Sequence, residues 1–499
     1  KADLGDGYAE TLRSVYPDVP ESADFVMYWW HKAAELAAAG KIRRFGFITT
    51  NSISQSFNRR VVQRALDGGL GLAFAVSDHP WVDTADGAAV RIAMTTAAPG
   101  ISAGQLLEIA QENPPSKNSS DGASDLVFRT SSGRINADLS TGADVSRAVA
   151  LQANERLSVN GMMLAGRGFV VTHDEAKELG VGSVPELAHR IRPIRNGRDL
   201  TDKSRNLFVI DMFGLDHIAV RKQFPAVYDH LIRTVKPERD ANARTKLRED
   251  WWLFGEVRKT LRAAIAGLPR YIATAETAKH RIFLFLPADI VPEHKLVAIA
   301  LDDGFRLGVL SSQIHVVFAL AAGSWLGVGN DPVYAKSRCF DPFPFPDCTE
   351  KQKDRIRKLA EELDAHRKRV QAKHGLGLTD IYNVLEKVRA GEELSAKDKA
   401  IHDAALVATL RQLHDDLDRA VAEAYGWPWP LTEAEILQRV VGLNAARAAE
   451  EKAGVVRWLR PDYQAKGELM LEGGSAHRPK AKPAKAKKPG KLAWPAKPA

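Results

Sequence analysis

Helical and strand-like hydrophobic patterns alternate over roughly the first hundred residues, and this order constrains the fold more than any other feature of the chain. Aromatic and aliphatic residues recur at helical spacing between Ser22, a candidate helix cap, and Gly40, which ends the pattern. The apolar run FGFITT is typical of a buried strand. In order, the patterns predict a helix, a strand, a helix and two further strands, at residues 21–40, 45–50, 56–66, 70–77 and 88–96. We therefore expect an α/β fold. Many different α/β proteins share this order of helices and strands.

Composition and periodicity change several times further along the chain. Residues 134–160 predict a turn-rich entry followed by a helix, and residues 190–346 mix helices with the strand-like runs LFVID, RIFLFL and RLGVL. From Thr349 the sequence is highly charged, with apolar residues at three-to-four spacing. The final residues, rich in Pro, Ala and Lys, cannot bury enough apolar surface to fold. We predict a sheet domain at residues 1–125, a connecting segment at 126–189 and a mixed α+β domain at 190–348. An α-helical C-terminal domain at 349–470 and a disordered basic tail at 471–499 follow.

Positive charge is concentrated in two places. The tail from His477 onward carries one Arg, seven Lys and no acid, which equals the net charge of +8, so the rest of the chain sums to zero. Within that neutral remainder, residues 190–346 hold 24 basic and 17 acidic residues, a local excess of +7. A basic domain in an otherwise neutral protein indicates a localised surface for a polyanion. The tail either adds salt-sensitive DNA affinity or only solubilises the chain.

Cysteine usage and hydropathy limit the other classes of partner. Cys339 and Cys348 bracket a Pro-rich loop and have no Cys or His at metal-ligand spacing. No apolar run approaches the length of a membrane span. We expect a reduced, cytoplasmic protein that binds no metal and no membrane.

An ordered series of sequence blocks resembles one family. Residues 24–60 and 81–94 contribute DFVMYWWHKAAELAAAGKIRRFGFITTNSISQSFNRR and WVDTADGAAVRIAM. From residue 191 follow IRPIRNGRDLT, LFVIDMFGL, VKPERDANAR, WWLFGE, RYIATAETAKHRIFLFL and DPFPFP, over about 150 residues. These blocks resemble the MmeI-type (type II restriction-modification) adenine-specific DNA methyltransferases, from just after their catalytic tetrapeptide to the end of their target-recognition region.

The resemblance implies a truncated Rossmann-like methyltransferase sheet followed by a target-recognition domain that binds double-stranded DNA. For the complete protein it implies methyl transfer from S-adenosylmethionine to adenine in a specific sequence, in restriction–modification or phage defence. Such enzymes need a glycine-rich turn for the methyl donor and a polar-Pro-Pro-aromatic tetrapeptide that grips the flipped adenine. In the family the tetrapeptide lies a few residues before the equivalent of Lys1. We therefore expect both elements upstream of Lys1, no catalytic residue in this chain, and no activity of the chain alone.

One internal stretch imitates the tetrapeptide. Asn113-Pro114-Pro115-Ser116 lies in residues 111–125, which their composition predicts to be a loop. Ser116 has no ring to stack on a flipped base, and the stretch follows the predicted strands instead of preceding residues 45–50. We interpret it as a loop turn.

Three groups of side chains are the candidate site. The adenine-pocket candidates are Thr50, Asn51 and Ser52, at the carboxyl end of the strand at 45–50, where ligands of open α/β sheets bind. The alternative is that they turn the chain and cap the next helix. Base-reading candidates precede FPFP: Trp325, Asn330, Asp331, Tyr334 and Lys336. The alternative role of Trp325 and Tyr334 is core packing, and that of Asn330 and Asp331 is to form a turn. Phosphate-binding candidates, which could instead pair with acids such as Asp199 and Asp202, are Arg192, Arg195, Arg198, Lys279 and Arg281.

Two further hypotheses stay open. The chain could be a non-catalytic DNA-binding specificity subunit that works with a separate catalytic chain, which would expose an apolar face where that partner docks. It could also be a nonfunctional remnant, in which case the amino-terminal segment would fold poorly while the recognition and helical domains survive.

Overall fold

The computed structural model describes residues 5–81, 90–113, 125–326 and 331–464. Contacts divide the chain into one large unit, Lys1–Arg457, and a small one, Trp458–Ala499. Every helix and strand described below lies in the large unit. The predicted tail at 471–499 lies outside the described residues.

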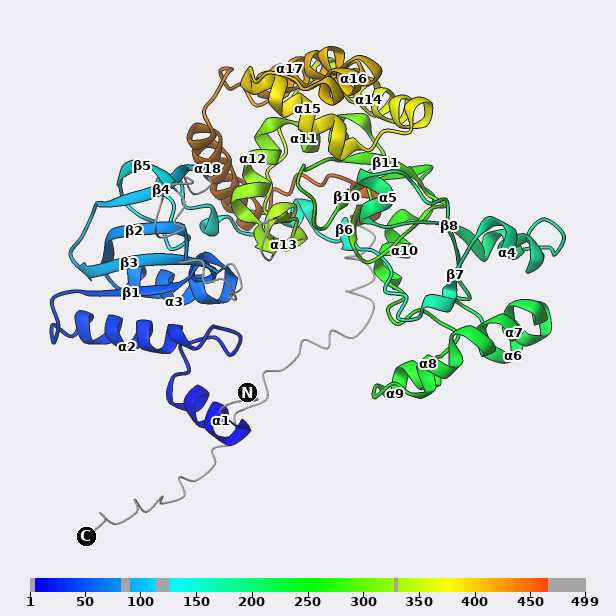
Figure 1. The fold of residues 1–499 in the computed structure, drawn as a ribbon, viewed down its shortest axis with the longest axis horizontal. Helices are drawn as coiled ribbons and strands as arrows, with labels where there is room; N and C mark the ends of the chain where they lie inside the picture. Colours follow the sequence, from blue (N-terminus) through cyan, green and yellow to red (C-terminus); the bar gives the residue numbers. More distant parts are fainter. Residues whose placement is uncertain (1–4, 82–89, 114–124, 327–330, 465–499) are drawn as a thin grey trace, which may run out of the picture. The chain divides into compact units, whose positions relative to one another are not determined.

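The first sheet has five strands in the order β1-β3-β2-β4-β5, and of these only β2 and β4 pair in parallel (Figure 1). Its strands are β1 Phe45–Thr50, β2 Leu70–Pro80, β3 Arg91–Pro99, β4 Gly104–Asn113 and β5 Asp125–Gly133. The helices before and between them are α1 Asp6–Val15, α2 Val26–Ala38 and α3 Ser56–Asp67. The predicted order of helix, strand, helix and two strands is confirmed. The ends of the predicted loop at 111–125 are strand residues, because composition marked its Pro- and Ser-rich centre and not its edges.

Helices α2 and α3 pack against this sheet and against each other. Met27, Trp30, Val62 and Leu72 are buried together in the core between them, and Trp30 Nε1 donates a hydrogen bond to the Thr95 hydroxyl at 3.3 Å. Helix α2 begins at Val26 and not near Ser22 as predicted. The reason is tertiary: Asp24 is held by a side chain of α3, as described below, so the turn before the helix does not join it.

The middle of the chain forms three smaller sheets (Figure 1). One has the order β11-β10-β13-β6, all antiparallel, from β6 Ser158–Asn160, β10 Arg270–Ala275, β11 Leu284–Pro287 and β13 Leu296–Ile299. A second has the order β12-β8-β9-β7, from β7 Val170–Val171, β8 Ile191–Arg195, β9 Phe208–Ile210 and β12 Val291–Pro292. The third is a two-stranded ribbon of β14 Ser324–Leu326 and β15 Asp331–Val333. Strand β6 comes from the segment predicted to be a connection.

Short helices surround these sheets. They are α4 His173–Glu178, α5 Gly197–Thr201, α6 His217–Gln223, α7 Pro225–Thr234, α8 Lys236–Asp240, α9 Thr245–Glu249, α10 Lys259–Ile265, α11 Gly304–Ser311, α12 Gln313–Ala322 and α13 Lys336–Cys339. The prediction that RLGVL is strand-like was wrong, since it lies in α11. Helix α11 is buried on nearly all sides, so its apolar run has no amphipathic period, and the Asp303 carboxylate accepts the Phe305 N–H at its start.

The helix predicted within residues 134–160 was also wrong. That stretch has two short 3₁₀ turns, η2 Val145–Arg147 and η3 Gln152–Asn154, before β6. The side chain of Asn444 accepts the Val149 N–H at 3.0 Å and donates to the Val149 carbonyl at 2.8 Å. Long-range partners therefore take the backbone groups that a helix would use.

The C-terminal region is helical, as predicted: α14 Glu350–His374, α15 Leu378–Ala390, α16 Ala396–Ala405, α17 Val407–Ala424 and α18 Glu433–Lys452. Helices α14 and α17 pack on α11, and a Cβ at Gly308 would lie 2.5 Å from Ile356 Cγ2, so this close approach requires glycine. Buried Arg367 donates to the Phe283 carbonyl at 2.9 Å and to the Tyr382 hydroxyl at 2.7 Å. The helical region is thereby joined to the residues that precede β11.

In the described part of the chain, no single helix is long and apolar enough to cross a membrane. The bent pair of α11 and α12 reaches that length and composition only when both helices are counted together.

Buried Asp418 predicts that stability falls as pH rises. Its carboxylate accepts the Gln313 N–H at 2.7 Å, and burial raises its pKa to about 7 against the opposing effects of that hydrogen bond and of Arg389. The folded state therefore keeps a proton on Asp418 between about pH 4, where the unfolded carboxyl titrates, and pH 7. The free energy of unfolding falls as pH rises through this window, by about 4 kcal/mol in total. We expect Asp418→Asn to melt at a higher temperature than wild type at pH 8 and at a similar one at pH 4.

The matched control is Glu423→Gln, which removes an exposed carboxylate from the same helix, away from Asp418. The measurement is the melting temperature of wild type and both variants from pH 4 to pH 8. A wild-type pH profile that Asp418→Asn shares unchanged would contradict the raised pKa.

Candidate nucleic-acid interface

A polar network occupies the end of β1, where the adenine-pocket candidates lie. The Thr50 and Ser52 hydroxyls are 2.6 Å apart, and the Ser52 hydroxyl donates to Asp24 Oδ2 at 2.5 Å. Asn58, on α3, donates to the same oxygen at 2.8 Å and accepts the Asp24 N–H at 2.8 Å. The structure therefore brings Thr50 and Ser52 together with two residues that the sequence did not single out.

Asn51 belongs to the neighbouring part of this network. Its side-chain amide donates to Asp78 Oδ1 at 3.1 Å, and Arg91 pairs with Asp78 at 2.6 Å. The alternative of helix capping is not met, because neither the start of the 3₁₀ turn at Asn51–Ser54 nor that of α3 has a side-chain cap. Thr50 is exposed while Asn51 and Ser52 are half-buried. Contact with an adenine stays a prediction for all three.

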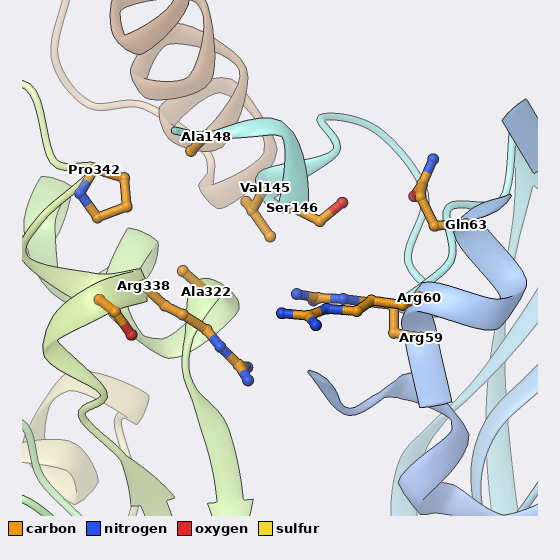
Figure 2. Close-up of a pocket in the computed structure, with 10 residues that line it drawn as sticks. Arg59, Arg60, Gln63, Val145, Ser146, Ala148, Ala322, Arg338 and Pro342 are labelled. Carbon is orange, nitrogen blue, oxygen red and sulfur yellow. The ribbon is translucent and has the colours of Figure 1, made fainter. Parts of the chain in front are cut away.

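Helix α3 also carries two arginines that the sequence analysis missed. Arg59 and Arg60 line one side of a cleft whose other side includes Arg338 of α13 (Figure 2). The sequence signal is visible in retrospect, since no acid lies three or four residues from Arg59 or Arg60 on α3. Arg338 carries no comparable signal.

The base-reading candidates lie in and beside the β14–β15 ribbon. In its register Ser324 faces Val333 and Leu326 faces Asp331. Trp325 is on β14, Asp331 begins β15 and is exposed, and Lys336 begins α13, where its ammonium pairs with Asp341 at 3.1 Å. Asn330 and the Trp325 side chain lie outside what the structure describes.

Arg281 and Tyr334 hold the base of this ribbon. The Arg281 guanidinium is buried and donates to the carbonyls of Pro332, at 2.9 Å, and Ala275. Tyr334 is buried as well; its N–H donates to the Glu276 carbonyl at 2.7 Å and its hydroxyl lies 3.0 Å from His315 Nε2. The Arg281 side chain and the Tyr334 N–H thus join β15 and its flank to the segment after β10, while the Tyr334 hydroxyl contacts α12. Direct contact with phosphate or base stays a prediction for both residues.

The ring of His315 contributes no charge to this anchor. Burial, with a smaller effect from the Arg281 charge, lowers the pKa of His315 to about 3. The imidazole is therefore neutral at neutral pH, and the positive charge of this anchor comes from Arg281.

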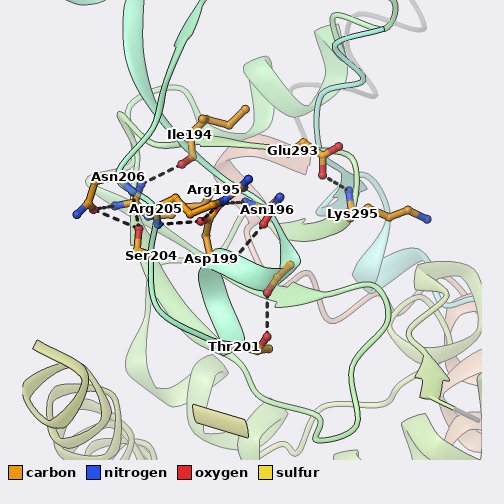
Figure 3. Close-up of polar contacts among 11 residues, drawn as sticks. Ile194, Arg195, Asn196, Asp199, Thr201, Ser204, Arg205, Asn206, Glu293 and Lys295 are labelled. Atoms are coloured by element: carbon orange, nitrogen blue, oxygen red, sulfur yellow. Dashed lines mark hydrogen bonds and ion pairs between the residues drawn. The ribbon is translucent and has the colours of Figure 1, made fainter. Parts of the chain in front are cut away.

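Arg195 ends β8, two residues before α5 (Figure 3), and Arg198 is the second residue of α5. The Arg195 guanidinium donates to the Ile194 carbonyl at 2.9 Å and to Asn206 Oδ1 at 3.2 Å, and it has no carboxylate partner among the described residues. Arg198 is exposed. Neither arginine forms an ion pair with an acid in the described part of the chain.

The nearby acid Asp199 is already paired. Its carboxylate accepts two hydrogen bonds from Arg205, at 2.9 and 2.8 Å, and caps α5 together with Asn196 (Figure 3). Burial would raise the pKa of Asp199, but Arg205 and the backbone N–H groups hold it below its usual value. The alternative pairing of the candidate arginines with Asp199 is therefore not what the structure shows.

The remaining phosphate candidates have protein partners. Arg192 pairs with buried Asp211 at 2.8 Å, and Arg262 pairs with the same carboxylate at 2.7 Å. The Lys279 ammonium is exposed and donates to Asn383 Oδ1 at 2.6 Å. Of the five candidates, Arg195 and Arg198 are the most available to an anion.

Neither a metal-ligand cluster nor a donor-binding turn after β1 is found in the described residues. No three His, Cys, Asp or Glu side chains gather there as metal ligands would. A glycine-rich turn after a strand would suit S-adenosylmethionine, but β1 passes into α3 through Asn51–Gln55, which contains no glycine. This connection therefore does not provide such a turn, and the place where S-adenosylmethionine binds stays a prediction.

Comparison with known proteins defines the class of the middle region. Residues 145–347 match the family model described as "MmeI, target recognition domain". This match includes the three smaller sheets and begins within the segment predicted to be a connection.

The chain as a whole is similar in fold to the type IIL restriction-modification enzyme MmeI, solved in complex with DNA. The TM-score is 0.68 at 18% sequence identity, and the match covers 89% of this chain and 55% of MmeI. The type IIG restriction endonuclease BpuSI matches with a TM-score of 0.28 and 10% identity, over 77% of this chain and 47% of its own, too weakly to carry an argument. No curated protein matches the chain. The resemblance to the MmeI-type family is confirmed, for a chain that spans about half of MmeI.

Proposed function

We propose that this chain is the DNA-reading portion of a site-specific adenine methyltransferase that uses S-adenosylmethionine in restriction–modification or phage defence. The observation that carries the proposal is the target-recognition match at residues 145–347, which includes the β14–β15 ribbon and the unpaired Arg195. A two-stranded ribbon fits the major groove of duplex DNA, where each base pair presents a distinct pattern of donors and acceptors.

The candidate residues divide the work of binding between them. Trp325, Asn330, Asp331 and Lys336 belong to the ribbon or its flanks, where Asn suits adenine and Asp accepts from cytosine. Arg195 and Arg198 supply phosphate contacts, which set affinity and register without reading sequence. The anchor of Arg281 and Tyr334 keeps the ribbon in one position relative to these arginines.

Methyl transfer belongs to the proposal for the complete enzyme. The network at Thr50, Asn51 and Ser52 would orient an adenine turned out of the duplex, with Asp24 and Asn58 holding these side chains in place. We expect the chain itself to bind DNA without methylating it, with the donor-binding turn and the catalytic tetrapeptide supplied upstream of Lys1. Both cysteines are free, in keeping with a reduced cytoplasmic location.

The direct test is binding of the chain to duplex DNA at several salt concentrations, with a methylation assay in parallel. We expect an affinity for duplex that falls steeply with salt, and no methyl transfer from added S-adenosylmethionine. Absence of any salt-dependent duplex binding would overturn the proposal.

Arg195→Gln with Arg198→Gln is expected to weaken binding to all duplexes alike, because phosphate contacts are independent of sequence. The slope of log affinity against log salt should fall by about one unit for each phosphate that the protein no longer neutralises. The control, Arg355→Gln, removes an exposed arginine that pairs with Glu423. If the double variant and the control had equal salt slopes, neither Arg195 nor Arg198 would contact a DNA phosphate.

A second candidate function is a specificity subunit for a separate catalytic chain. Strand β1 ends the first sheet, so within the described residues one of its edges has no partner strand. Ile48 on β1 is 55% exposed and Trp29 on α2 is 56% exposed. An open edge beside exposed apolar side chains suits a further strand, from a partner or from the rest of one polypeptide. Recovery of methylation on addition of a separate catalytic chain would favour this second function.

A further inference from the structure

Three arginines face one another across a cleft of about 260 Å³ (Figure 2). Arg59 and Arg60 reach into it from α3, and Arg338 reaches toward them from α13. Ser146 of the 3₁₀ turn η2 and Pro342 complete the lining. The cleft thus lies between the helix that follows the β1 network and the helix that follows the ribbon.

No ion pair joins Arg59, Arg60 or Arg338 to a carboxylate in the described part of the chain, although the charge of Arg59 acts on the buried carboxyl of Asp138 and opposes the rise that burial causes in its pKa. The one hydrogen bond of the Arg338 guanidinium is a long one, 3.4 Å to the Gly323 carbonyl. Burial, and then the charges of Arg59 and Arg60, lower the pKa of Arg338. By contrast Arg64, one turn further along α3, pairs with Asp18 at 2.7 Å. Like charges held together in a half-buried cleft are unfavourable unless an anion joins them.

The geometry points to a phosphate-binding cleft in which Arg59, Arg60 and Arg338 together hold a backbone phosphate of duplex DNA. The inference rests on the proposed DNA binding by the recognition domain. Guanidinium groups match phosphate oxygens in a planar, bidentate way, and three of them suit the charge and the two free oxygens of a phosphodiester.

The position of the cleft favours DNA over a free anion. Arg338 comes five residues after Val333, the last residue of the ribbon. Arg59 directly follows Asn58, which holds the network at Thr50 and Ser52 through Asp24. The cleft is thus lined by the helix next to the ribbon and the helix next to the β1 network, and a duplex that contacts both the ribbon and the end of β1 would pass it. One phosphate gripped from both sides would fix the recognition domain relative to the first sheet.

The test compares the triple variant Arg59→Gln, Arg60→Gln and Arg338→Gln with wild type and with Arg64→Gln, which removes a paired arginine from the same helix. Affinity for duplex DNA is measured by fluorescence anisotropy over a range of salt. We expect the triple variant to bind about 10- to 100-fold more weakly at low salt, with a salt slope smaller by about one unit. Arg64→Gln should bind like wild type.

Two further measurements distinguish loss of a DNA contact from misfolding of the triple variant and from binding of a free anion. The single variant Arg60→Gln changes an exposed side chain and should show part of the same loss even if the triple variant folds poorly. Inorganic phosphate is titrated against wild type to detect a site for a free anion. If phosphate stabilises wild type while the variants bind duplex as Arg64→Gln does, the cleft is a free-anion site and the inference is overturned. If wild type itself binds no duplex, the proposed function fails as well.

Discussion

Replacing Arg281 by methionine is expected to lower the free energy of unfolding by about 3 kcal/mol and to abolish discrimination between DNA sequences. The buried guanidinium donates to the carbonyls of Pro332 and Ala275, and each lost hydrogen bond of this kind costs about 1–3 kcal/mol. An apolar side chain would leave the Pro332 carbonyl with only the long, 3.4 Å hydrogen bond from the Ala278 N–H in the described part of the chain. Methionine fills a similar volume, so the loss of the donors dominates over the loss of packing.

The functional consequence follows from the position of those carbonyls. Pro332 lies in β15, so the ribbon loses the side-chain hydrogen bond to that carbonyl, and within the described residues the backbone bonds from Ala278 and Tyr334 remain to connect it to the segment after β10. Affinity for a preferred duplex should fall toward the non-specific level, about 1,000-fold or more, while non-specific binding persists. Thermal unfolding and anisotropy against preferred and unrelated duplexes measure the two effects.

Lys279→Met is the matched control for this variant. Lys279 lies two residues earlier, is exposed and carries the same charge, so its loss should change stability by at most about 0.5 kcal/mol. If Arg281→Met were as stable as Lys279→Met and bound the preferred duplex as wild type does, Arg281 would not be the anchor of the ribbon.

Asp211→Ala is expected to destabilise the protein by about 3 kcal/mol, because it leaves two partly buried guanidinium groups without their counter-charge. The Asp211 carboxylate, 4% exposed, accepts from Arg192 at 2.8 Å and from Arg262 at 2.7 and 2.9 Å. Burial would raise the pKa of Asp211, but the Arg262 hydrogen bonds and both arginine charges bring it below its usual value. The stabilisation is therefore present at neutral pH and is lost as pH falls below about 4.

Urea unfolding at pH 7 measures this effect, with Asp240→Ala as the control. Asp240 pairs with Lys236 on the surface, where the loss of an ion pair costs about 0–1 kcal/mol. Equal unfolding midpoints for the two variants would show that the Asp211 cluster does not stabilise the fold. Weakened DNA binding in a folded Asp211→Ala protein would instead indicate that Arg192 needs Asp211 to hold its position.

Local patterns were sufficient to predict the elements whose structure depends on their own sequence. The strand Phe45–Thr50, the helix Ser56–Asp67 and the charged C-terminal helices all follow from hydrophobic periodicity. The stretch before β6 could not be predicted in this way, because Asn444, nearly three hundred residues away, takes the backbone groups of Val149. Tertiary hydrogen bonds of this kind leave no trace in a local window.

The candidate site was predicted as regions more successfully than as single residues. The sequence pointed to the end of β1 and to the ribbon, and both are places where polar side chains gather. It could not tell that Arg281 is buried while Arg198 is exposed, because burial of an arginine depends on which carbonyls the fold places around it. The cleft at Arg338 depends on α3 and α13 meeting in space, and two helices so far apart in the sequence give no signal of it.

Selection from a library of randomised DNA duplexes tests most directly the central claim that this chain reads DNA sequence. The wild-type chain is incubated with the library at physiological salt, and the bound duplexes are recovered and sequenced over several rounds. We predict enrichment of one short motif, bound about 1,000-fold or more tightly than unrelated duplex. Recovery of duplexes with no shared motif, bound as tightly as the starting library, would contradict the claim.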